Sequence, residues 1–286
     1  MKILVLGISG MLGNAMFRVL KEDTSLEVFG VSRSNVNHQF FNSEVNSSIY
    51  TGIDVTQQEA LRQLFVKIRP EVVVNCIGLI KQLMQATDPL QAIPINALLP
   101  HQLASLCEVN SARLIHVSTD CVFSGKRGNY RESDLSDADD IYGKSKYLGE
   151  VSYPHTLTLR TSIIGHELES ASNLSLLGWF LRQEGPVMGY RNAIFSGLPT
   201  VELSRIVRNI ILPRPLLSGV YHVAAAPIAK YDLLKLIAEI YSKKITIIPD
   251  DNLVIDRSLN ADLFNQETGY RPADWNELVQ RMFEFQ

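Results

Sequence analysis

The sequence predicts an α/β protein built on a doubly wound parallel sheet, with a smaller C-terminal lobe. Short apolar runs alternate with helical patterns through the first half of the chain, which is typical of parallel strands joined by right-handed helical crossovers. The first run, residues 2–6, leads directly into a glycine turn and a helical pattern over residues 14–20. Beyond Ile164 the alternation breaks down, so we expect the remaining residues to build a separate lobe.

Strands are expected where the apolar runs are short, and helices where apolar residues recur at helical spacing. The first crossover helix is expected over residues 57–68 on this ground. Thr56 and Glu59 have the spacing of a capping box at its start. The predicted strands are residues 2–6, 27–31, 71–76, 113–118, 156–159, 219–224 and 244–249, and the later helices lie near 174–181, 200–211 and 230–241.

The run at residues 219–224 indicates a strand that returns to the sheet from within the C-terminal part of the chain. We therefore assign residues 1–165, together with about 216–228, to the sheet domain. Residues 166–215 and 229–286 are assigned to the lobe.

Composition is that of an ordinary soluble enzyme. The chain has 286 residues, 46% hydrophobic and 20% charged, with a formal net charge of -3. No basic cluster indicates nucleic-acid binding, the first apolar run is too short for a signal peptide, and no stretch approaches a membrane span. Cys76, Cys107 and Cys121 lack metal-ligand spacing, as do the histidines. We therefore expect reduced thiols in a cytoplasmic protein, no metal site and no membrane partner.

The glycine turn has the spacing G-x-x-G-x-x-G at Gly7, Gly10 and Gly13. Gly7 permits a tight turn, Gly10 lets the backbone approach a pyrophosphate, and Gly13 allows the helix to pack closely on the strand. The N-terminus of the helix would offer N–H groups to the phosphates. An ordinary strand-to-helix loop is the alternative, but the turn has a strand before it and a helix after it, as a dinucleotide site requires.

Two further segments indicate acid–base chemistry. Tyr142 and Lys146 stand four residues apart in a helical segment, so their side chains share a face, and a neighbouring ammonium lowers the pKa of a phenol. Ser118 and Thr119 end an apolar strand, and ligands of parallel sheets bind beyond the carboxyl ends of the strands. Alone, each pair has an alternative, a solvated helix face or a helix cap. Together they place a hydroxyl and a phenol where both would meet one substrate oxygen.

These motifs, in this order, resemble the extended short-chain dehydrogenase/reductase family, and within it the dTDP-4-dehydrorhamnose reductase group. The resemblance implies a Rossmann-type domain that binds a nicotinamide dinucleotide and a lobe that binds a nucleotide sugar. The residues that carry it are Gly7, Gly10, Gly13, residues 75–78, Asn96, residues 118–123 and 142–146, Gly149, Glu150, and residues 159–162, 257–260 and 268–272.

The activity that the resemblance implies is reduction of the 4-keto group of a nucleotide-linked 4-keto-6-deoxyhexose, in the synthesis of deoxysugar and polysaccharide precursors. Tyr142 would donate the proton, Thr119 would bond the same oxygen, and Lys146 would lower the pKa of Tyr142 and hold the nicotinamide ribose. The expected cofactor contacts are Gly7, Ser9, Gly10, Met11, Leu12, Gly13, Ser32, Arg33, Asp54, Val55, Cys76, Ile77, Gly78, Asn96, Ser118, Tyr142 and Lys146.

The expected substrate contacts are Thr119, Asp120, Cys121, Ser196 and Arg257. Arg257 would bind the diphosphate bidentately. Ser196 and Thr200 would bind the nucleotide, or else serve as a turn and a helix cap. Dimers are common among proteins of this fold, so a homodimer is allowed.

The choice of cofactor depends on the end of the second strand, where Arg33 stands between two serines and no carboxylate is present to bind a ribose 2′-hydroxyl. Because a guanidinium suits a 2′-phosphate, we favour NADP(H), with NAD(H) as the other cofactor that such reductases accept. Asp54 is a cofactor candidate near the adenine, with a helix cap as its alternative role.

The residue at position 121 helps to distinguish between the reactions of related families. Sugar-nucleotide 4,6-dehydratases carry glutamate there, and a thiol cannot replace that carboxylate base, so dehydration is disfavoured. The dehydrorhamnose reductases usually carry tyrosine there, which leaves the identity of the sugar open. Two alternatives also stay open: a 4-epimerase that uses the same three residues with tightly held NAD, and a non-catalytic regulatory subunit like that of methionine adenosyltransferase, which resembles the same reductases.

Overall fold

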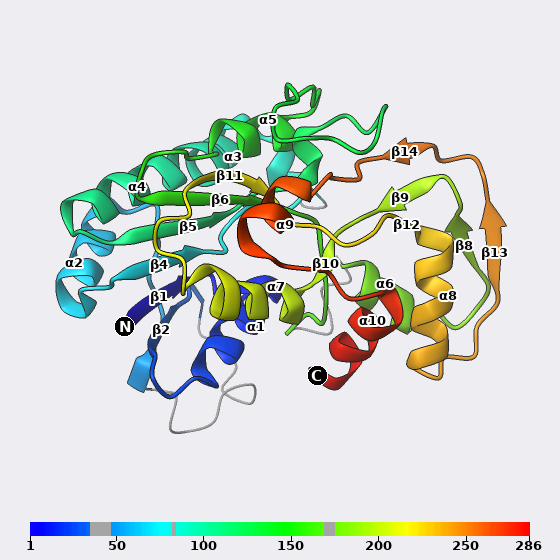
Figure 1. Ribbon diagram of the computed structural model, residues 1–286, viewed down its shortest axis with the longest axis horizontal. Coiled ribbons are helices and arrows are strands. Elements are labelled where there is room, and N and C mark those ends of the chain that lie inside the picture. Colours follow the sequence, from blue (N-terminus) through cyan, green and yellow to red (C-terminus); the bar gives the residue numbers. More distant parts are fainter. Residues whose placement is uncertain (35–46, 82–83, 169–174) are drawn as a thin grey trace.

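The computed structural model describes residues 1–34, 47–81, 84–168 and 175–286, and its centre is a seven-stranded parallel sheet (Figure 1). The strand order is β11-β6-β5-β4-β1-β2-β3, so the order reverses between β1 and β4, where open α/β sheets bind their ligands. The predicted α/β class is confirmed. The strands are β1 Lys2–Leu6, β2 Glu27–Val31, β3 Ile49–Tyr50, β4 Val72–Asn75, β5 Arg113–Val117, β6 Thr156–Arg160 and β11 Gly219–His222.

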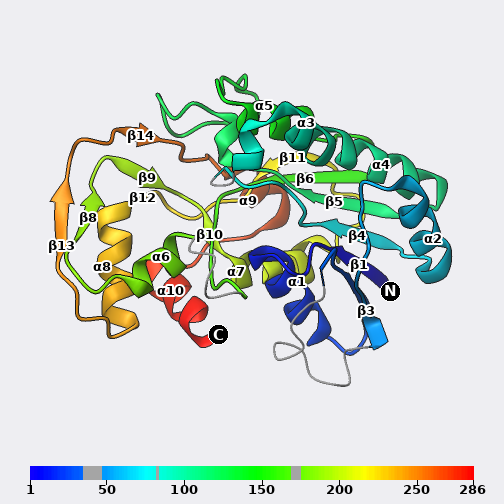
Figure 2. The same ribbon diagram turned by 180° about the vertical axis from the view of Figure 1, so that it is seen from behind.

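Helices cover both faces of this sheet (Figures 1 and 2). Along β1 the side chains alternate between two buried clusters: Ile3 and Val5 belong to the larger one, and Leu4 and Leu6 to the other. Both faces of the strand are therefore apolar, as a fully covered parallel strand requires. One face carries α1 Met11–Lys21 and α7 Thr200–Ile206, and the other carries α2 Gln58–Ile68, α3 Pro89–Ala92, α4 Leu99–Val109 and α5 Ile141–Leu148.

Strand β11 returns to the sheet from the C-terminal part, as the sequence predicts, and pairs in parallel with β6. The position of helix α7 differs from the sequence-based division of the chain, which assigns residues 200–211 to the lobe. Arg208, just beyond α7, donates to the Val19 carbonyl at 2.8 Å and forms an ion pair with Glu22 at 2.7 Å, which fixes this segment on α1. The remaining boundaries of the two parts stay a prediction.

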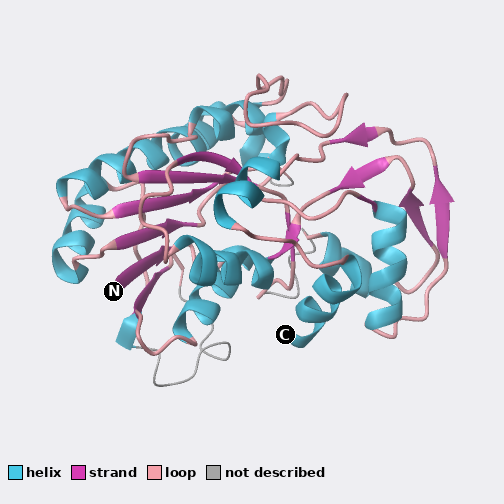
Figure 3. Cartoon of the chain, viewed as in Figure 1, coloured by secondary structure: helices cyan, strands magenta, loops and turns pink. Residues whose placement is uncertain are grey.

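Outside the central sheet, the described residues form three small sheets and four further α-helices, most of them in the part predicted to be the lobe (Figure 3). Its middle sheet has the order β12-β9-β14, and the other two pair β10 with β7 and β13 with β8. No helix in the described part combines the length and apolar character that a membrane crossing needs. The elements are β7 Ile163–Ile164, α6 Leu176–Arg182, β8 Val187–Tyr190, β9 Ala193–Phe195, β10 Leu198–Pro199, β12 Ile228–Ala229, α8 Lys230–Ile240, β13 Ile247–Asp250, β14 Ile255–Asp256, α9 Asp262–Thr268 and α10 Trp275–Glu284.

The glycine turn after β1 brings the first turn of α1 against the backbone that precedes it. Gly7 has a φ of 88°, which L side chains rarely adopt. A Cβ atom at Gly13 would lie 2.0 Å from the Gly7 carbonyl oxygen, so only glycine permits this approach. Both roles predicted from the sequence for these residues agree with this geometry.

Replacing Gly13 by alanine should destabilise the protein by about 1–3 kcal/mol or more, because the methyl group overlaps a backbone atom that cannot move without distorting the turn. The measurement is the free energy of unfolding in urea. Gly185→Ala is the matched control, since a Cβ there meets nothing within 4 Å. Equal stabilities for the two variants would contradict the close approach of α1.

Candidate active site

Tyr142 and Lys146 lie on α5, which begins where the Asp140 carboxylate accepts from the Gly143 amide at 2.7 Å. Lys146 is 4% exposed, and its amine donates to the Val117 carbonyl at the end of β5, at 2.9 Å. Burial lowers the pKa of Lys146 to about 8, although the neighbouring Glu150 raises it. The lysine is thus held on the carboxyl edge of the sheet.

Thr119 and Tyr142 meet at the same edge. The Thr119 hydroxyl accepts from the Cys121 amide at 3.2 Å, donates to Asp120 Oδ1 at 3.2 Å and contacts the Tyr142 phenol. Burial raises the pKa of Tyr142, and the charges of Cys121 and Asp120 act in the same direction. The phenol therefore holds its proton at neutral pH, as a proton donor must.

This direction differs from the sequence-based expectation that Lys146 lowers the pKa of Tyr142. The physical reason is that the partly buried phenol has lost much of its hydration, while the Lys146 amine is directed to the Val117 carbonyl. Desolvation of the phenolate is the dominant effect in the protein alone. The role of Lys146 as the charge that activates the tyrosine stays a prediction.

The loop after β4, with Cys76, Ile77 and Gly78, lies beside the lysine. Asn96 holds this loop: its Oδ1 accepts from the Leu79 amide at 2.8 Å, and its Nδ2 donates to Ser145 of α5 at 3.2 Å. A Cβ at Gly78 would lie 3.6 Å from the Lys146 amine. The structure therefore brings this predicted cofactor loop and Asn96 together with the acid–base residues.

The glycine turn presents an uncapped helix N-terminus. Gly10 occupies the N-cap position of α1 without a side-chain cap, and Ser9 and Gly10 are exposed. Met11 is partly exposed, whereas the Leu12 side chain is buried in the core, so Leu12 offers only its backbone. Free backbone donors at a helix N-terminus suit a phosphate group.

The far end of the predicted cofactor site lies at the end of β2. Arg33 is exposed there and acts electrostatically on Asp54, while Ser32 is buried and donates to the Ser34 carbonyl at 2.8 Å. Hydrogen bonds from Thr56 lower the pKa of Asp54: one carboxylate oxygen accepts from the Thr56 hydroxyl at 2.7 Å and from its amide at 3.0 Å. Val55 is buried in the core.

The predicted capping box is wrong. Helix α2 begins at Gln58 with Gln57 as its N-cap, and no side chain caps it. Thr56 instead bonds back to Asp54, which closes an Asx turn ahead of the helix.

Three predicted hydroxyls face inward. Ser118 donates to Glu150 at 2.8 Å, Ser196 accepts from the Leu259 amide at 3.0 Å, and Thr200 is the first residue of α7 rather than its cap. The geometry gives the Ser118 and Ser196 side chains structural partners and does not open them to a ligand.

A charged group lies at the substrate end, beside Thr119. Arg257 donates from Nε to the Phe123 carbonyl at 2.8 Å. Burial raises the pKa of Asp120 and raises that of Cys121 to about 12, while Arg257 acts to lower both. Lys230 also acts on Asp120 and was missed from the sequence, where it is only the first residue of a helical pattern.

Glu150 is a second residue whose role no motif revealed, although the motifs included it. Its carboxylate accepts from Arg160 Nε at 2.8 Å and Nη2 at 2.7 Å, and the two side chains are 4% and 5% exposed. The same carboxylate accepts from Ser118 and acts on Lys146. It therefore joins α5 to the ends of β5 and β6.

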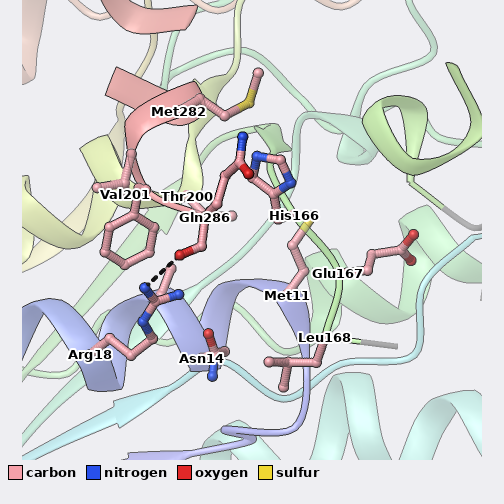
Figure 4. Close-up of a pocket in the computed structure, with 12 residues that line it drawn as sticks. Met11, Asn14, Arg18, His166, Glu167, Leu168, Thr200, Val201, Met282 and Gln286 are labelled. Carbon is pink, nitrogen blue, oxygen red and sulfur yellow. Dashed lines mark hydrogen bonds between the residues drawn. The ribbon is translucent and has the colours of Figure 1, made fainter. Parts of the chain in front are cut away.

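A cavity of about 50 Å³ lies away from these residues, between α1, α10 and the segment after β7 (Figure 4). Of the residues predicted to bind a ligand, Met11 and Thr200 belong to its lining. Arg18 donates across it to the Gln286 carbonyl at 3.0 Å. The cavity is therefore separate from the acid–base site.

Comparison with known proteins agrees with this arrangement. Residues 1–284 match the family described as the RmlD substrate binding domain. A dTDP-4-dehydrorhamnose reductase of Aggregatibacter actinomycetemcomitans is 23% identical over 98% of this chain and 98% of its own. A methionine adenosyltransferase 2 subunit beta of Danio rerio is 25% identical over 88% of this chain and 76% of its own.

Among solved structures, a dTDP-4-dehydrorhamnose reductase from Bacillus anthracis in complex with NADP superposes with a TM-score of 0.79 and 20% identity, over 99% of this chain and 98% of that chain. At this identity the likeness shows the fold.

Glu150→Gln should lower the free energy of unfolding by about 3–5 kcal/mol, because it leaves the buried Arg160 charge without its counter-ion. Urea unfolding gives the value. The control is Asp251→Asn, which breaks the exposed pair with Arg191 and should change stability little. A Glu150→Gln protein as stable as that control would show that the buried pair does not hold this edge of the sheet.

Proposed function

The chain belongs to the RmlD substrate binding domain family, and from that premise we propose that it reduces the 4-keto group of a nucleotide-linked 4-keto-6-deoxyhexose with NADPH. The observation that carries the proposal is the meeting of Thr119, Tyr142 and Lys146 at the carboxyl edge of β5. The full-length reductase relative supports the same activity.

The acid–base residues can complete a carbonyl reduction. Bound NADPH would supply the hydride for the carbonyl carbon. Tyr142 donates its proton to the oxygen as negative charge develops there, and Thr119 donates a hydrogen bond to the same oxygen. Lys146 would hold the nicotinamide ribose of the bound cofactor, and its positive charge would stabilise the phenolate that remains after Tyr142 gives up its proton.

The residues present fit such a cofactor. The uncapped N-terminus of α1 and the exposed Ser9 and Gly10 suit the diphosphate. Arg33 offers a planar cation to a 2′-phosphate at the end of β2. No carboxylate follows this strand directly, and Asp54 already binds Thr56, so the site favours NADPH over NADH.

The alternatives make different demands. A 4-epimerase would carry bound NAD through purification and act without added cofactor. A regulatory subunit, which the Danio rerio relative represents, would bind a partner enzyme and need no acid–base set. The complete set of Thr119, Tyr142 and Lys146 favours catalysis.

The proposal extends to assembly and location. Large apolar side chains are exposed on the neighbouring helices α3 and α5, at Leu90 and Leu148, which supports a homodimer. The three cysteines are free thiols, which supports a location in the reducing cytoplasm.

Tyr142→Phe should lower kcat by about 10²- to 10⁴-fold, because the proton donor is lost, and change the affinity for NADPH little. The assay follows NADPH absorbance with dTDP-, UDP- and GDP-linked 4-keto-6-deoxy sugars. Tyr147→Phe, on the exposed side of the same helix, is the control. Turnover close to the wild-type value in Tyr142→Phe would remove Tyr142 from the mechanism.

Arg33→Ala should weaken NADPH binding by about 10-fold or more and NADH binding little, because only NADPH carries the 2′-phosphate. Fluorescence titration with both coenzymes measures the two affinities. Arg69→Ala serves as the control, since Arg69 is exposed and lies between α2 and the start of β4, at the amino ends of the strands. Equal losses for the two coenzymes would make Arg33 a bystander.

A further inference from the structure

Lys230 is a partly buried cation that the chemistry above does not use. It is the first residue of α8 and directly follows β12. Within the described ranges, its amine has neither a hydrogen bond nor an ion-pair partner. Burial lowers its pKa, and the nearby Asp120 and Cys121 raise it. A charge removed from water without a direct partner needs another explanation.

The middle sheet of the lobe places β12, which precedes Lys230, and β14, which precedes Arg257, on either side of β9 (Figure 1). Ile194 of β9 pairs with Ala229 on one side and with Asp256 on the other. Lys230 follows Ala229, and Arg257 follows Asp256. Because β12 runs antiparallel to β9 and β14 runs parallel to it, Lys230 comes beside Ala193 and Arg257 beside Phe195. The two cations thus lie on opposite sides of the Ile194 row but on the same face of the sheet, since side chains alternate along a strand, although 27 positions (257 − 230) separate them in the chain.

Both cations lie close enough to the carboxyl group of Asp120 to act on its charge. Arg257 and Lys230 both act on it to lower its pKa, against the effect of burial. Asp120 directly follows Thr119, whose hydroxyl it accepts from. The cations thus lie beside the proposed reaction site, on its lobe side.

The donors that remain free match a diphosphate. Arg257 uses Nε to bond the Phe123 carbonyl, which fixes the guanidinium, and its terminal nitrogens have no hydrogen bond within the described part of the chain. Arg257 also acts on Asp140, which is ion-paired with Lys81. Three cations, Arg257, Lys230 and Lys81, therefore stand against the carboxylates of Asp120 and Asp140, which leaves one positive charge in excess. The diphosphate of a nucleotide sugar is an anion with several acceptor oxygens, which such donors bind by charge-assisted hydrogen bonds.

We propose that Lys230 binds the diphosphate of the substrate together with Arg257, as a contact that no sequence motif revealed. The proposal rests on the proposed function, because it takes a nucleotide sugar as the ligand. Lys230 acts on binding and on the placement of the sugar, and it takes no part in proton transfer.

The test is calorimetric titration with dTDP, UDP and GDP in the presence of saturating NADPH. Lys230→Gln should lower the affinity for the nucleoside diphosphate that the wild-type protein binds by about 10- to 100-fold, since it removes a charge-assisted contact. Lys230→Arg keeps the charge and should restore most of the affinity. Lys235→Gln, which changes an exposed lysine of the same helix, should change nothing.

Four results distinguish failure of the inference from failure of the proposed function. Undiminished affinity in Lys230→Gln overturns the inference, and so does an equal loss of NADPH affinity, because the effect would then be general. A wild-type protein that binds none of the three diphosphates removes the inference and the proposed function together. A wild-type protein that binds one of them through Lys230, yet reduces no keto sugar, would leave the inference standing and overturn the proposed function.

Discussion

The buried pair between Glu150 and Arg160 is the interaction on which the rest of the structure depends. It joins the end of α5 to the end of β6, and through Ser118 to the end of β5. Arg160 Nη1 also lies 3.2 Å from His222 Nε2 at the end of β11. The carboxyl ends of three neighbouring strands and the helix with the acid–base residues are therefore held by one network. Because both charges are buried, removing either side chain would leave the other charge buried without a counter-ion, which would strongly destabilise the protein.

Burial also decides the electrostatics of the proposed reaction site. The pKa of Tyr142 is raised and that of Lys146 is lowered, so each group is shifted toward its neutral form. A protonated phenol is the state that a reductase needs before hydride transfer, whereas an oxidation would need the phenolate. The site is thus prepared for the reductive direction by desolvation alone, before any charge from a bound cofactor is added.

Local patterns predict most of the fold and the acid–base part of the site, because a strand, a glycine turn or the spacing of Tyr142 and Lys146 depends on residues close in the chain. They fail where the partner is distant. The Ser118 hydroxyl bonds a carboxylate 32 positions away, and Ser196 bonds an amide 63 positions away. The amphipathic pattern of α7 predicts a helix but not that it packs on α1. Lys230 joins the site only through strand register, which no local pattern contains.

The middle sheet of the lobe has a consequence for how the protein folds. β9 pairs with β12, 33 positions later (195 to 228), and with β14, 62 positions later (193 to 255). Contacts between distant segments require large loops to close, which slows folding. The strands from β1 to β6 precede all of these segments, so during synthesis the sheet can begin to pair while the lobe still lacks its strands. The lobe, which is proposed to hold the substrate, would then fold last. A chain interrupted before β14 would keep much of the central sheet but could not complete the middle sheet of the lobe.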